Sequence, residues 1–466
     1  MGLFGVDAPT RRFAPLPARY RVFSIALMSL LGCGRSGFYI SVVNDRLTDS
    51  DSPTSSLPPW GEYVATLSLP PCPASPFPSL VVDTLTDELD GGEGLSEPSL
   101  AGPSLSFVEA IFIAANRVGV DVIEFTPDVF PVSTPGVIQV RTRSFPNGFA
   151  YEPSALCINA RDRGVVIEWL EGLDSFCAEP APGECVWHLQ AGSVQVGLEL
   201  RRLPMPIWVA NGSKMAGCVL DAPYRQLEVQ GTPQVEIGPG NVFAQSVWAV
   251  SVQTQSDVWI HDNFFSYDPR GFVYSPTSNT IALFAGALIE GNVFASEQAF
   301  QGRPPSGEIA VVRHNSFGVD TAGRQLAGSL SGIESLVSGK WIVGPGNVVR
   351  GTRCGVCSSS SAVTQVTRNS ITGTEVGIVT AAPFAPPAIT AVSATSVAGT
   401  CATPGMVEVF SDAGDQGETF LTDTVCGSSL TWAAATPVPV GRNVTATLTD
   451  DNGHTSAFSA PVALAN

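Results

Sequence analysis

Short apolar runs alternate with polar turn residues along most of this 466-residue chain, and one short pattern recurs six times between residues 237 and 371. In each copy, an asparagine has an aliphatic residue three or four positions before it and an apolar residue two positions after it. The intervals between successive asparagines are 22, 29, 23, 32 and 22 residues, which indicates a base repeat of about 22 residues with two insertions. The six asparagines are Asn241, Asn263, Asn292, Asn315, Asn347 and Asn369.

This repeat predicts a parallel β-helix, because about 22 residues accommodate three short strands and three bends in one coil. Coils stack at the inter-strand spacing of about 4.8 Å, so equivalent side chains lie directly above one another. The apolar residues after the asparagines then form a column, and the asparagines form a hydrogen-bonded ladder at a bend, where asparagine tolerates left-handed backbone geometry. No coil can bury its own inner face, so the core depends on stacking.

One helical segment is expected before the β array, within residues 104–116. Apolar residues at 107, 108, 111, 112 and 115 follow helical spacing, and Ser106 with Glu109 three residues later matches a capping box. The open end of a β-helix exposes strand edges and apolar interior, so we predict that this helix caps it.

The composition of the chain changes on both sides of the predicted β-helix, which we place at residues 79–383. Residues 33–78 are rich in Ser, Pro and Asp and are interpreted as a tether, with short ordered pieces around 60–69. A proline-rich hinge at 383–387 is followed by alternating strands with turns at intervals of about 8–12 residues, which predict a small β-sandwich over 384–466. The predicted fold class is therefore all-β.

Residues 1–32 are typical of an export signal rather than of folded structure. Arginines at 11, 12, 19 and 21 precede an uncharged, mostly apolar run at 22–32, which is too short to cross a bilayer as a helix. The run ends Leu30-Leu31-Gly32-Cys33, which looks like a bacterial lipoprotein cleavage box and predicts acylation of the Cys33 thiol. The alternative is an ordinary secretion signal followed by an incidental cysteine.

An exported chain can keep disulfides, and the ten cysteines offer several pairs. With Cys33 assigned to the lipid, the candidate pairs are Cys177 with Cys185, Cys354 with Cys357, and Cys401 with Cys426. A fourth candidate is Cys157 with Cys218, which leaves Cys72 unpaired. The spacing of Cys354 and Cys357 matches a redox motif, but no thioredoxin-like βαβ context surrounds it, so we interpret it as a loop staple.

The charge of the chain limits its partners. The net charge is −18, and only 14% of residues are charged. Such a surface repels nucleic acid and anionic lipid headgroups, but it is compatible with carbohydrate. We therefore expect no nucleic-acid partner, and contact with a membrane only through the lipid at Cys33.

The chain resembles the right-handed parallel β-helix repeat proteins of bacterial cell surfaces, within the wider pectin-lyase-like group. The resemblance covers roughly residues 80–380 and rests on the asparagine repeats, on the segment 317–326 and on the segment 105–111, which is similar to the opening of many such repeats. Residues 444–458 look like the last hairpin of bacterial Ig-like modules. The resemblance implies a right-handed coil and a terminal Ig-like module, but it does not specify an activity.

No constellation of residues in the sequence identifies a reaction or a cofactor. The repeat region lacks the close Asp pairs and the Gly-His-Gly of related sugar hydrolases, and the clustered Asp residues of Ca²⁺-dependent lyases. His261 and His314 occupy adjacent slots of the repeat, where surface positions at a bend are the simpler explanation. Asp83, Asp87 and Asp90 could hold Ca²⁺ but match no calcium-loop motif.

Two functions from different classes remain open. The first is a non-catalytic cell-surface lipoprotein, in which the β-helix serves as a scaffold or as a binding face for glycan or extracellular matrix. The second is a carbohydrate-active enzyme, a polysaccharide lyase or glycoside hydrolase, whose site assembles from the inserted loops around 266–279 and 318–331. The chain is expected to be exported and held at the cell envelope or outer surface by the lipid at Cys33, with plain secretion as the alternative.

Overall fold

The computed structural model describes residues 59–86, 103–140, 155–170, 187–203, 206–222, 225–230, 234–253, 257–274, 280–296, 298–305, 307–326, 332–380, 382 and 384–464. The predicted signal segment, the lipidation residue Cys33 and the pair Cys177 and Cys185 lie outside these residues.

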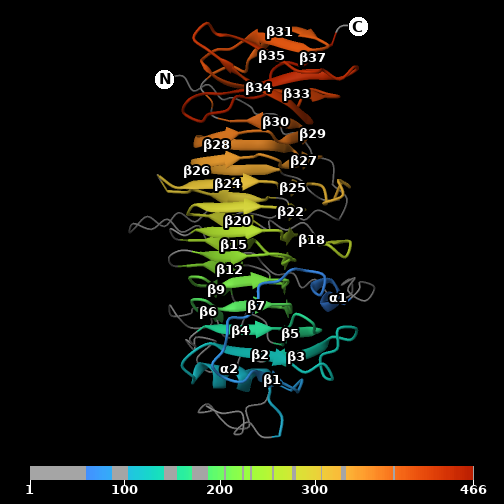
Figure 1. Cartoon of the computed structure of the whole chain (residues 1–466), viewed down its shortest axis with the longest axis vertical. Helices are drawn as coiled ribbons and strands as arrows, with labels where there is room; N and C mark the ends of the chain where they lie inside the picture. Colours follow the sequence, from blue (N-terminus) through green and yellow to red (C-terminus); the bar gives the residue numbers. More distant parts are fainter. Residues whose placement is uncertain are drawn as a thin grey trace, which may run out of the picture. The chain divides into compact units, whose positions relative to one another are not determined.

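The repeat region is a parallel β-helix, which confirms the predicted fold class (Figure 1). A coil consists of three short strands, as in β13 (Val235–Ile237), β14 (Val242–Phe243) and β15 (Trp248–Val252). Each strand pairs in parallel with its counterpart one coil later, so that β13 lies beside β16 (Val258–His261) and β14 beside β17 (Phe264–Phe265). The strands therefore stack into three sheets, which we call faces A, B and C.

From β4 (Leu156–Asn159) onward each face collects one strand from every coil, and the two long strands β26 (Ile333–Val343) and β28 (Cys354–Val366) run continuously from face C into face A. Face A also contains β1 (Leu80–Val82), β2 (Asp121–Phe125), β4 (Leu156–Asn159), β7 (Val194–Val196), β10 (Lys214–Ala216), β13, β16, β21 (Ala287–Glu290) and β24 (Ile309–Arg313). Face B contains β3 (Gly136–Val140), β5 (Val165–Trp169), β8 (Leu198–Arg201), β11 (Val219–Leu220), β14, β17, β22 (Val293–Phe294), β25 (Ser316–Phe317), β27 (Val348–Arg350) and β29 (Ser370–Thr372). Face C contains β6 (Trp187–Leu189), β9 (Ile207–Val209), β12 (Arg225–Val229), β15, β20 (Thr280–Leu283), β23 (Phe300–Gly302) and β30 (Val376–Val379).

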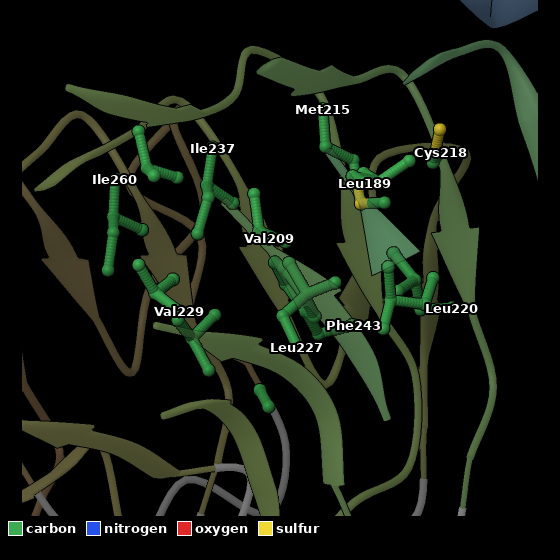
Figure 2. Close-up of a cluster of buried hydrophobic side chains, with 14 of the residues drawn as sticks. Leu189, Val209, Met215, Cys218, Leu220, Leu227, Val229, Ile237, Phe243 and Ile260 are labelled. Carbon is green, nitrogen blue, oxygen red and sulfur yellow. The ribbon is translucent and has the colours of Figure 1, made fainter. Parts of the chain in front are cut away.

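The interior of the coils is apolar and arranged in columns. Figure 2 shows buried side chains from successive strands, among them Leu189, Val209 and Leu227, gathered inside the coil. The four phenylalanines that follow the asparagines stack face to face, with ring centroids 4.6–4.8 Å apart and interplanar angles of 10° or less. They are Phe243, Phe265, Phe294 and Phe317.

The asparagines form a continuous hydrogen-bonded ladder at the bend between faces A and B. From Asn263 onward, each side-chain oxygen accepts from the backbone N–H and the side-chain Nδ2 of the asparagine one coil earlier, as Asn315 does from Asn292 at 2.9 and 3.0 Å. The residue before each asparagine has a positive φ, for example +51° at Asp262 and +70° at Gly291. This geometry explains why glycine precedes three of the six asparagines, because glycine adopts it without steric cost.

Helix α2 (Phe107–Ala115) covers the N-terminal end of the coils, as predicted. Ser106 accepts from the backbone N–H of Glu109, and the Glu109 carboxylate accepts from the backbone N–H of Ser106, so both halves of the capping box form. The helix packs on β1 and β2, and all of its residues from Phe107 to Ala114 are buried.

Residues 59–72, which we call the strap, lie across the outside of the coils and include helix α1 (Trp60–Val64). Trp60 and Leu69 are buried against apolar outer residues that include Val219 and Val242. The Trp60 Nε1 donates to the carbonyl oxygen of Gly217 at 2.8 Å, and a disulfide joins Cys72 to Cys157.

The cysteine pairing corrects one prediction. Cys157 is bonded to Cys72, not to Cys218, and Cys218 is a free, buried thiol. Cys157 faces outward beneath the strap, whereas Cys218 belongs to the interior core, so the wall of the coil separates the two side chains. Disulfides also join Cys354 to Cys357 and Cys401 to Cys426.

Residues 384–464, the C-terminal module, form two antiparallel sheets that share one cluster of buried residues. One sheet has the order β31 (Ala388–Ser393), β32 (Ser396–Thr400), β35 (Thr431–Ala435). The other has the order β34 (Thr419–Cys426), β33 (Gly405–Asp412), β36 (Asn443–Thr449), β37 (Val462–Ala463).

The module closes the C-terminal end of the β-helix through hydrogen bonds to the last coil. The backbone N–H groups of Ile371 and Gly417 donate to each other's carbonyl oxygens at 2.9 and 3.0 Å. The backbone N–H of Val366 donates to Thr455 Oγ1 at 2.8 Å, and that of Arg368 donates to Glu408 Oε2 at 2.9 Å. These contacts satisfy strand-edge groups that an open β-helix end would expose.

Candidate functional site

The ladder asparagines are structural in position. All six are buried, and their amides are occupied by neighbouring coils. They therefore hold the bends in register and do not present polar groups to a ligand.

The structure does not bring His261 and His314 together. His261 ends β16, and His314 precedes the asparagine of the coil two steps later. The His261 ring lies 3.4 Å from a Glu236 carboxylate oxygen and 3.0 Å from that of Asp262.

Of the three aspartates considered as calcium ligands, only Asp83 lies in the described part of the chain. Asp83 accepts the backbone N–H of Leu105 at 2.7 Å, while Asp87 and Asp90 lie outside the described residues. Among described residues, no group of three or more His, Cys, Asp or Glu side chains could hold a metal ion.

The two inserted loops meet on the outside of face B. The first forms the hairpin β18 (Tyr267–Asp268) and β19 (Phe272–Val273), and Tyr267 packs in one cluster with Leu326 of the second. Asp268 forms a buried ion pair with Arg270, and Asp320 pairs with Arg324 at 2.7 Å. Burial, with the nearby Asp268 carboxylate, raises the pKa of Tyr63 in the strap to about 12. Asp268 and Asp320 are thus each neutralised by an arginine of the same loop, and these ion pairs stabilise the loops.

A different set of residues forms an ordered outer surface on face A. One outward position of each strand aligns in register from β10 to β28, and the inward residue that follows it is a buried isoleucine, valine or methionine. We call this set the face A row. It consists of Lys214, Glu236, Trp259, Leu288, Val311, Ile342 and Gln365.

Trp259 is the most distinctive member of the row, because 39% of this large aromatic residue is exposed. Its ring stacks on His261 with centroids 3.8 Å apart and planes 21° from parallel. Its Nε1 donates to a carboxylate oxygen of Glu290 at 2.9 Å, and the other oxygen of Glu290 accepts from Arg313 at 2.7 Å. The indole is therefore held in one orientation while part of its surface faces solvent.

Such an arrangement is suited to binding rather than to bond cleavage. An exposed indole offers an apolar face and a polar edge, which complement the C–H face and hydroxyl groups of a pyranose ring. On the same face Lys214 pairs with Glu236 at 2.6 Å, so the nearby charges compensate one another. Sequence reasoning missed Trp259, although the alternation in Val258-Trp259-Ile260-His261 places Trp259 on the side opposite the buried Ile260.

A groove of about 600 Å³ lies where the last coil meets the C-terminal module. Lys340, Gln365 and Arg368 line it from the coil, and Met406 and Val425 line it from the module. No local sequence pattern predicted this groove, because it forms only where the module packs on the coil.

Neither a protein-family model nor a curated protein sequence matches this chain. Within the described ranges, no helix combines the length and apolarity needed to cross a membrane.

Proposed function

We propose that this chain is an exported surface protein whose β-helix binds an extended, uncharged polysaccharide without cleaving it. The observation that carries the proposal is Trp259, which is part-exposed on a sheet of strands aligned in register and is fixed by His261 and Glu290. In this proposal the chain belongs with the cell-surface β-helix repeat proteins of the pectin-lyase-like group, and residues 384–464 are an Ig-like module.

The regularity of face A supports an extended ligand. Row residues recur once per coil, at about 4.8 Å, a distance comparable with one sugar residue in an extended chain. The apolar Leu288, Val311 and Ile342 continue the row from Trp259, and each is half-buried. A polymer lying along the row would pack its C–H faces on these residues.

The charges beside the row favour a neutral ligand. Lys214 and Arg313 are each paired with a carboxylate, and the chain carries a net charge of −18. A polyuronate would bring further negative charge to carboxylates at Glu236, Asp262 and Glu290 and be repelled by them. Hydroxyl groups can instead hydrogen-bond to the same carboxylates.

The enzyme alternative is less well supported by the inserted loops. Hydrolysis needs one protonated and one ionised carboxyl group available to the substrate. Asp268 is fully buried and bonded to Arg270, and Asp320 accepts backbone N–H groups from Ala322 and Arg324 as well as the Arg324 side chain. Both carboxylates are thus already engaged within their own loops.

We further propose that the lipid at Cys33 holds the protein at the cell surface through the tether before the strap. The strap supports this arrangement, because the disulfide of Cys72 and the hydrogen bond of Trp60 attach this segment firmly to the coils. Labelling of cells with a fatty-acid analogue should mark the wild-type protein and not a Cys33→Ala variant, and an unlabelled wild-type protein would contradict the anchor.

The binding proposal is tested with the mature protein and a panel of neutral, acidic and amino polysaccharides, scored for retention and for release of reducing ends. We expect retention by a neutral polymer, no product release, and at least a tenfold loss of affinity in Trp259→Ala. Phe284→Ala is the matched control, because Phe284 follows β20 on face C and is 40% exposed. Equal binding by Trp259→Ala and wild type, or steady product release, would overturn the proposal.

A further inference from the structure

We infer that the groove between the last coil and the C-terminal module is a second subsite of the same binding face, so that the protein selects ligands by length. This inference rests on the proposed function of face A. It adds a second contact region, contributed partly by the module, and a minimum length for a tightly bound oligosaccharide.

The groove is continuous with the face A row. Trp259 aligns with Leu288, Leu288 with Val311, Val311 with Ile342, and Ile342 with Gln365, which lines the groove. These are four coil steps of about 4.8 Å, or about 19 Å from Trp259 to Gln365. A polymer that follows the row from Trp259 therefore reaches the wall of the module.

The wall offers an apolar contact at the end of this path. Met406 and Val425 are direct cross-strand neighbours on β33 and β34, and 42% and 64% of these residues are exposed. Both line the groove, together with the turn that contains Asp450, Asp451 and Asn452. Exposed apolar surface beside hydrogen-bonding groups is the same combination that Trp259 and Glu290 present farther along the face.

The wall is held rigidly against the coil. The Glu408 carboxylate accepts hydrogen bonds from the Thr367 hydroxyl and from the backbone N–H of Arg368, and the Arg368 guanidinium pairs with Asp423. All four residues line the groove. Because these contacts exist without ligand, little ordering entropy is lost when a ligand binds.

Two subsites about 19 Å apart on one rigid surface predict a dependence on ligand length. A short oligosaccharide can occupy only one subsite, whereas one that spans both gains the second contact as an intramolecular event. Linked binding of this kind raises affinity by roughly 100-fold or more.

The test uses the mature protein and a length-graded series of oligosaccharides cut from the polymer that the panel retains, with Kd measured by calorimetry. We expect affinity to rise steeply once the oligosaccharide exceeds about 19 Å. Val425→Glu should abolish this rise while leaving the affinity for short oligosaccharides unchanged. Val440→Glu is the matched control, because Val440 is 79% exposed on the same module and does not line the groove.

Asp451→Ala provides a second variant at an exposed turn residue, so the result does not depend on one substitution in β34. It should reduce the affinity for long oligosaccharides only. If Trp259→Ala weakens all binding but neither groove variant alters the length dependence, the second subsite is wrong and the proposed function stands. If no oligosaccharide or polymer binds, both are wrong.

Discussion

Asn263 donates from its side-chain Nδ2 to the side-chain oxygen of Asn292, 3.0 Å away in the next coil, and its backbone N–H donates to the same oxygen at 2.9 Å. Asn292 in turn donates to Asn315 by the same two groups. Every asparagine inside the ladder thus accepts from buried N–H groups of the asparagine one coil earlier and donates to the side-chain oxygen of the asparagine one coil later. The ladder ties coils that are separated by 22 to 32 residues in sequence.

We predict that Asn292→Ala lowers the free energy of unfolding by about 3 kcal/mol, because it leaves two buried donors of Asn263 without an acceptor. Urea denaturation followed by circular dichroism measures the change. Ser316→Ala is the control, since Ser316 is a half-buried polar residue in the neighbouring coil and should change stability by less than about 0.5 kcal/mol. Equal effects of the two variants would show that the ladder contributes little.

Cys218 occupies the position equivalent to Asn241 in the preceding coil. Its backbone N–H donates to the Asn241 side-chain oxygen at 3.0 Å, as the N–H groups of the ladder asparagines do. Its thiol lies 3.8 Å from the carbonyl oxygen of Gln195, and the Asn241 side chain donates to the carbonyl oxygen of Met215. These two contacts are equivalent, because Gln195 and Met215 are aligned in neighbouring coils. The thiol therefore stands where an asparagine amide would lie.

We predict that Cys218→Asn extends the ladder and stabilises the protein by about 1 kcal/mol, the usual gain from one added hydrogen bond. Thermal unfolding of Cys218→Asn and Cys218→Ala provides the comparison, with the asparagine variant expected to be the more stable. Burial raises the pKa of the Cys218 thiol to about 12, so alkylation at neutral pH should require unfolding. An asparagine variant less stable than the alanine variant would contradict this assignment.

Much of the fold could be predicted from sequence because the pattern around each asparagine sets both register and side-chain direction. The segment Met215-Ala-Gly-Cys218-Val-Leu220 has the same pattern with cysteine in place of asparagine, and a search based on spacing rather than on residue type would have found it. Earlier coils lack the signal entirely. In those coils Val165 of β5 aligns with Leu198 of β8 on face B. An apolar residue at this position is typical of any buried strand, so it does not mark a repeat.

The two parts of the candidate site differ in how far they could be predicted from sequence. Trp259 follows from strand alternation alone, once the inward side of β16 is known from Ile260. The groove depends on contacts between residues far apart in sequence, such as Arg368 with Glu408, and no local pattern specifies such contacts. The disulfide partner of Cys157 likewise depends on the strap, which covers it from 85 residues earlier.

The strap disulfide should contribute substantially to stability. Cys72 and Cys157 close a loop with a sequence separation of 85, and the chain-entropy model assigns such a loop about 4.5 kcal/mol. We predict that the double variant Cys72→Ser, Cys157→Ser loses most of this amount in urea denaturation and becomes sensitive to proteolysis within residues 65–78. Replacing Cys354 and Cys357 is the control, because their separation of 3 predicts only about 2 kcal/mol. A larger loss in the control would contradict the model.

Glu408 should make the closed end of the β-helix sensitive to pH. Burial raises the pKa of this carboxyl group above its ordinary value of 4.5, against the hydrogen bonds from Thr367 and Arg368 that favour ionisation. The unfolded chain therefore releases the Glu408 proton at a lower pH than the folded protein does. Between the two pKa values the folded state binds more protons, so the free energy of unfolding falls as pH rises through that range. Below pH 4.5 the two states are protonated alike and this loss is absent.

We accordingly predict that Glu408→Gln, which cannot ionise, gains in thermal stability relative to wild type as pH is raised from 4 to 8. The glutamine oxygen can still accept from the Arg368 N–H, so the contact between module and coil is retained. Glu375→Gln is the matched control, because it makes the same chemical change at an exposed residue of the last coil. A constant difference between Glu408→Gln and wild type across this range would mean that Glu408 has the same pKa in the folded and unfolded states.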